Sequence, residues 1–124
     1  MVDYLPQYLR LLQRALAVLD ELLALYAPDQ QTTAADWAAR CLLHTQQQRS
    51  SLAQRLAQPP ASLTAEDTST VTVSLGHYLD SHWADYQQLP TADPAKRVQL
   101  LALHGALEAV IKDLAPLHNA LRAG

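Results

Sequence analysis

The fold of this 124-residue chain depends on how one stretch folds, TSTVTVSLGHYLDSHWADYQQL, residues 68–89. Its first eight residues alternate polar and apolar side chains and are rich in β-branched types, which is typical of a strand. Larger side chains also recur at helical spacing along the whole stretch: Val71, Leu75, Tyr78, Leu79, His82, Tyr86 and Leu89. A single strand in a helical chain would leave its backbone hydrogen-bonding groups without partners. We therefore predict a helix from about Ala65 to Leu89, capped by Thr64 with Asp67.

The composition also favours helices. Apolar residues make up 49% of the chain, and leucine and alanine supply most of them. Phenylalanine is absent, and Ile111 is the only isoleucine. Because strands favour β-branched and aromatic residues, a core of leucine and alanine indicates helices. The predicted fold class is all-α.

Three more segments show apolar side chains at helical spacing. The four helices are predicted at about residues 4–27, 34–58, 65–89 and 93–122. Prolines, which cannot donate the helical hydrogen bond, mark the breaks between them: Pro28, Pro59, Pro60 and Pro90. Pro116 falls inside the last segment, where we expect a kink or a helix end near Leu114. Helices of this length with short connections predict one domain, residues 1–124, folded as a single antiparallel up-down-up-down four-helix bundle.

The first predicted helix has a wide apolar surface. One stripe along it contains Leu5, Leu9, Leu12, Leu16, Leu19 and Leu23. A second stripe beside it contains Leu11, Val18, Leu22 and Leu25. Together they cover roughly half of the circumference, whereas a surface helix usually needs only about a third. We predict that the second stripe is the interface of a homodimer. The alternative is a monomer in which this helix is central and both stripes are core.

Three histidines are candidates for chemistry. His82 lies within the apolar stripe of the third helix, while His44 and His104 lie at the edges of the apolar faces of the second and fourth. They are weak candidates for a metal site, because imidazole is a common metal ligand. The Glu-x-x-His pattern of carboxylate-bridged di-metal bundles does not occur. We expect no metal and no cofactor, and we expect His82 to be buried, neutral and structural.

No enzyme signature is evident in the sequence. The chain lacks a glycine-rich phosphate loop, and its only cysteine, Cys41, is expected to be a small buried side chain. The run CLLHTQQQRSSL, residues 41–52, resembles the helical histidine region of histidine phosphotransfer domains, which are also four-helix bundles. The lysine and glycine that typically follow the histidine in those domains are absent after His44. We therefore expect a protein that is not an enzyme.

Charge and hydropathy limit the partners and the location. The net charge is −3 with only nine Lys and Arg residues, whereas binding to nucleic acid needs a basic surface. No apolar run approaches the roughly 20 residues that cross a bilayer. The start of the chain, MVDYLPQYLR, has no basic region before its apolar residues, unlike a secretory signal. We expect a cytoplasmic protein that binds neither nucleic acid nor membranes.

Two functions are compatible with these features. The wide apolar arc of the first helix favours a protein-interaction module, such as an adaptor, chaperone or regulatory subunit, that self-associates through that helix. The alternative is a small-ligand or metal-binding bundle that uses inward-facing histidines and the aromatic side chains of Tyr78, Trp83 and Tyr86.

Overall fold

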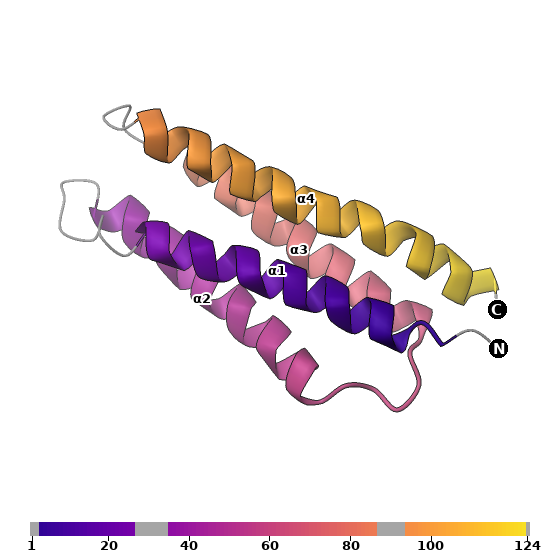
Figure 1. Ribbon diagram of the computed structural model, residues 1–124. Helices are drawn as coiled ribbons and strands as arrows, with labels where there is room; N and C mark the ends of the chain where they lie inside the picture. The colour runs from indigo at the N-terminus through magenta and orange to yellow at the C-terminus, as the bar shows by residue number, and fades with distance from the viewer. Residues whose placement is uncertain (1–2, 27–34, 87–93, 124) are drawn as a thin grey trace.

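The computed structural model describes residues 3–26, 35–86 and 94–123, although the side chains of residues 26, 35–39, 82–86, 94 and 96 lie outside this description. The described backbone forms four helices and no strand: α1 Leu5–Tyr26, α2 Ala35–Ala57, α3 Ala65–Tyr86 and α4 Pro94–Ala123. Successive helices run in opposite directions (Figure 1). Both α1 and α3 pack against α2 and α4. The predicted all-α, up-down-up-down four-helix bundle is confirmed.

Residues 68–75, whose pattern also suits a strand, are helical in α3. Three threonines there donate their hydroxyls to carbonyls of the preceding turn at 2.8 Å: Thr68, Thr70 and Thr72. Threonine makes this bond when it is held in a helix. Val71 and Leu75 are fully buried. Packing against the other helices therefore overrides the local preference for a strand.

The predicted cap at the start of α3 is present. The backbone N–H of Asp67 donates to Thr64 Oγ1 at 3.3 Å, and the backbone N–H of Thr64 donates to Asp67 Oδ2 at 2.9 Å. This reciprocal pair is a capping box with aspartate in the usual glutamate position. It satisfies backbone donors that the first turn of a helix leaves unpaired.

The start of α3 is also tied to the end of α4. The Nδ1 atom of His118 lies 2.9 Å from Thr68 Oγ1 and 3.1 Å from the carbonyl oxygen of Ala65. A carbonyl can only accept, so the second contact requires a proton on Nδ1. Because Thr68 is fully buried, these bonds fix how the two helices are aligned.

The last helix continues through Pro116 to Ala123. Pro116 lies on the exposed side of α4, where water can bind the carbonyl that a proline leaves without its helical donor. Leu114 and Leu117 on either side of it are buried, and they hold the final turns on the bundle. The predicted helix end near Leu114 is therefore wrong.

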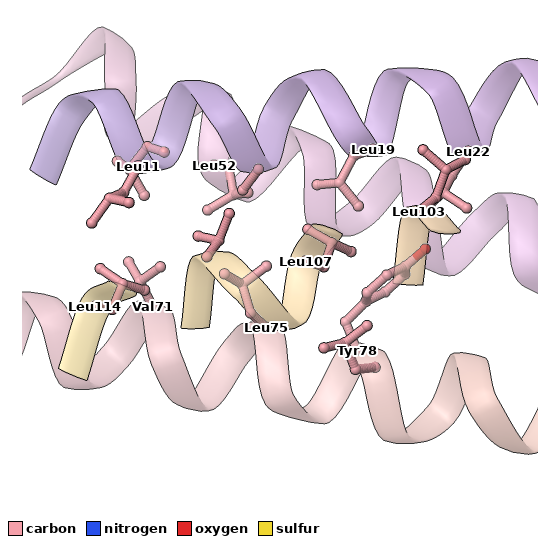
Figure 2. Packing of buried hydrophobic residues seen from close by; sticks show 14 of the residues in the cluster. Leu11, Leu19, Leu22, Leu52, Val71, Leu75, Tyr78, Leu103, Leu107 and Leu114 are labelled. Carbon is pink, nitrogen blue, oxygen red and sulfur yellow. The ribbon is translucent and has the colours of Figure 1, made fainter. Parts of the chain in front are cut away.

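Leucines from all four helices fill the core. Those that are almost completely buried are Leu12, Leu19, Leu22, Leu52, Leu75, Leu100, Leu107, Leu114 and Leu117. Figure 2 shows Leu19 of α1, Leu75 of α3 and Leu107 of α4 pointing into the same interior space. Each buried leucine contributes roughly 1.5–3 kcal/mol relative to an exposed one, so this set dominates the stability of the fold.

Replacing Thr64 by alanine should lower the free energy of unfolding by about 1 kcal/mol, because the capping hydroxyl is lost. Urea denaturation followed by circular dichroism measures the change. Thr70→Ala is the matched control, since the Thr70 hydroxyl also bonds the backbone but lies inside the helix. Alanine is the better helix former there, so stability should stay constant or rise by up to about 0.7 kcal/mol. Equal losses in the two variants would contradict the role assigned to the cap.

Candidate functional site

The stripe of α1 predicted as an interface lies against the core of the same chain. Leu11 and Leu22 are 5% and 0% exposed. Val18 and Leu25 are partly buried and pack against the core cluster. The wide apolar arc of α1 is used within the chain, since this helix packs against both α2 and α4. The burial of Leu11 and Leu22 therefore removes the reason for predicting a dimer through this stripe.

Ion pairs mark the two flanks of α1. Arg14 Nη1 lies 2.8 Å from Asp113 Oδ2 of α4, and Asp20 pairs with Arg49 of α2. All four side chains are about half exposed, so each pair contributes at most roughly 1 kcal/mol. Their positions identify which neighbour covers which side of α1.

The histidine candidates are not all brought together. His44 lines a groove between α2 and α3, whereas His104 lines a groove between α3 and α4. The side chains of His82, Trp83 and Tyr86 lie outside the described part of α3, so the burial and structural role of His82 stay predictions. Among the side chains that are described, no group of three His, Cys, Asp or Glu residues is placed to hold a metal ion.

The groove between α3 and α4 contains a histidine–carboxylate pair. The groove is open to solvent and has a volume of about 470 Å³. Its lining residues are Gly76, Leu79, Asp80, His104, Glu108 and Ile111. His104 Nδ1 lies 3.0 Å from Glu108 Oε1, one helical turn along α4. The His104 side chain is only 13% exposed, while that of Glu108 is 51% exposed. The pair orients the imidazole ring, and Asp80 adds a second carboxylate from the facing helix.

The groove between α2 and α3 is lined by residues whose side chains carry polar groups. It encloses about 380 Å³, and its lining includes His44, Gln48, Ser74, His77, Tyr78 and Ser81. Gln48 Nε2 donates to Ser74 Oγ at 2.9 Å across the two helices. The placement of His77 and His44 in one groove could not be predicted from the sequence, because it depends on how α2 and α3 are aligned.

A chain of buried hydrogen bonds lies beneath this groove. Thr45 Oγ1 donates to the carbonyl oxygen of Cys41 at 2.7 Å, so the phenol of Tyr78, also 2.7 Å away, donates to Thr45. Burial raises the pKa of Tyr78 above its ordinary value, because it disfavours the charged phenolate. Cys41 is buried, as the sequence predicted.

The outer surface of α4 carries exposed apolar side chains. Val98 and Leu101, one turn apart, are 67% and 46% exposed. Ala102 and Gly105 continue the same side of the helix and are also exposed, and Ala109 is partly exposed. We call these five residues the outer stripe of α4. The sequence could not separate this stripe from the core face, because apolar residues occur all around the first half of α4.

Comparisons with known proteins do not identify this chain. No protein-family model, no curated protein and no solved structure matches it. Within the described residues, no helix is both long enough and apolar enough to cross a membrane.

Stability should fall at alkaline pH because of Tyr78. Its pKa in the folded protein is raised above the ordinary value of 10.0. The contribution of the neutral phenol to the free energy of unfolding is therefore complete below pH 10. As the pH rises further, the free energy of unfolding falls by at most about 1.4 kcal/mol per pH unit. The pKa of Tyr8 is also raised by burial, which adds a decline of the same sign. Urea denaturation at a series of pH values measures the effect.

Two variants isolate the contribution of Tyr78. Tyr78→Phe should cost about 1 kcal/mol at neutral pH and should weaken the alkaline decline, because the titrating group is gone. Thr45→Val removes the same hydrogen bond but keeps the phenol, so its alkaline decline should persist. The assignment to Tyr78 is wrong if the free energy of unfolding of Tyr78→Phe falls as steeply with rising pH as that of the unmodified protein.

Proposed function

We propose that this protein acts by binding protein chains and that its binding surface is the outer stripe of α4. The main support for this proposal is that Val98 and Leu101 are exposed on the side of α4 that faces away from the core. None of the five residues of the stripe is charged. Exposed apolar patches on small soluble domains tend to mark interaction sites.

Gly105 supports close approach by another helix. A glycine inside a helix costs roughly 0.5–1 kcal/mol relative to alanine. Nothing within the described part of the chain calls for glycine at this position. A Cβ atom there would meet no atom within 4 Å, and the backbone φ is not positive. A small residue on an exposed helix face lets the backbone of a partner helix come near.

A second copy of this chain fits the outer stripe. If two α4 helices cross in antiparallel fashion about a two-fold axis near Leu103, Val98 of one copy faces Ala109 of the other. In the same arrangement Ala102 faces Gly105, so larger side chains lie opposite smaller ones as close packing requires. Two-fold contacts of this kind are the commonest among soluble oligomers. The proposal therefore keeps a homodimer but locates its interface on α4.

Charge is compatible with this pairing. The register that places Ala102 opposite Gly105 also places Glu108 opposite Gln99 and Lys112 opposite Ala95. Like charges that face each other across the axis would oppose association. None do so in this register.

Gly105→Glu tests the proposal. Sedimentation equilibrium at micromolar concentration should give a dimer mass for the unmodified protein and a monomer mass for the variant, since two carboxylates would be forced into an apolar contact. The variant should still fold, because glutamate is a better helix former than glycine by roughly 0.5–1 kcal/mol. A monomer mass for the unmodified protein would contradict self-association.

Two further variants locate the interface. Leu43→Glu is the matched control, because Leu43 is 52% exposed on α2 and lies outside the outer stripe; it should remain dimeric. Val18→Glu tests α1. Since Val18 packs against the core, this change should destabilise the fold. A Val18→Glu protein that is stable and monomeric would show instead that the interface lies on α1.

A further inference from the structure

We propose that His44 and His77 form a two-ligand site for a divalent transition-metal ion, with zinc as the representative ion, at the outer edge of the groove between α2 and α3. The two imidazoles come from different helices and line the same groove. Bound metal would therefore link α2 to α3. This proposal is independent of the interface proposed on α4.

The alignment of α2 and α3 is fixed by two hydrogen-bonded contacts. Thr45 lies 2.7 Å from the Tyr78 phenol oxygen, and Gln48 Nε2 lies 2.9 Å from Ser74 Oγ. Three residues forward along α2 correspond to four residues back along α3 between these contacts, so the two contacts agree on the antiparallel register to within one residue.

This register places the two histidines near the same level. One step back from Thr45 and one step back from Tyr78 run in opposite directions along the bundle, so the two Cα atoms are offset by roughly 3 Å along the helix axes. His44 directly precedes Thr45, and His77 directly precedes Tyr78. One step back along a helix turns the side chain by about 100°. Because α2 and α3 run in opposite directions, that step turns both imidazoles toward the same outer side of the helix pair.

The surroundings suit a cation. Both histidines are exposed, so their ring nitrogens are accessible. The other residues that line the groove are serines, glutamines and Tyr78, and no lysine or arginine is among them. Imidazole nitrogen is a preferred ligand of zinc, copper and nickel. Zinc takes four ligands, so water or oxygen atoms such as Ser81 Oγ would complete its coordination.

A metal at this position would stabilise the folded chain. Within the described residues, α2 packs less extensively against α3 than against α1, so a link across this pair reinforces a weaker contact. An ion that binds only the folded state raises the stability with concentration. With free zinc at ten times its dissociation constant, the melting temperature should rise by roughly 4–6 °C.

The test is a zinc titration of untagged protein, followed by thermal denaturation and by calorimetry. We expect one zinc ion per chain and a saturable rise in melting temperature. His44→Gln and His77→Gln should each abolish both, and His104→Gln, which alters the groove between α3 and α4, should retain both. The proposal is overturned if zinc leaves the melting temperature unchanged, or if either single variant binds zinc as tightly as the unmodified protein.

A second measurement distinguishes a site within one chain from a bridge between two chains. Sedimentation of the Gly105→Glu variant, with and without zinc, should give the same mass in both conditions. Dimerisation that depends on zinc would show that the imidazoles of separate chains share the ion, and the proposed link between α2 and α3 would then be wrong.

Discussion

The bundle depends on the burial of α1 by two neighbours at once. Five side chains of α1 are at most 1% exposed: Tyr8, Leu12, Ala15, Leu19 and Leu22. Partly buried leucines of α1 pack against the core cluster, and the helix contacts both α2 and α4. A helix placed between two others must be apolar over more of its circumference than a helix at an edge. The composition of α1 is therefore a consequence of its place in the fold.

The helices could be predicted because apolar spacing is a property of each segment by itself. The spacing that includes Val71, Leu75 and Tyr78 correctly outweighed the strand-like alternation of residues 68–75. The wide apolar arc on α1 correctly indicates that this helix has much surface to cover, since it packs against both α2 and α4. The arc does not say whether the covering helix belongs to the same chain. For this reason the arc predicts an interface that includes Leu11 and Leu22, although both side chains lie in the core.

The candidate sites depend on distances between helices, which the sequence does not contain. His77 lines the same groove as His44 only because the Thr45–Tyr78 contact aligns α2 with α3. The outer stripe of α4 could not be predicted from the sequence for a different reason. Leu100 and Leu103 are buried while Leu101, between them, is 46% exposed, and only the position of the neighbouring helices separates the two groups.

The threonines and valines of α3 have a consequence for the behaviour of the chain during folding. Residues 68–75 carry no charge and no proline, and their side-chain types favour extended structure. Segments of this kind are prone to pair with one another as strands when they are exposed. In the native bundle the complete burial of Val71 and Leu75 keeps the segment helical and out of that state. Docking of α3 on its neighbours therefore keeps this segment from pairing as a strand, as well as completing the core.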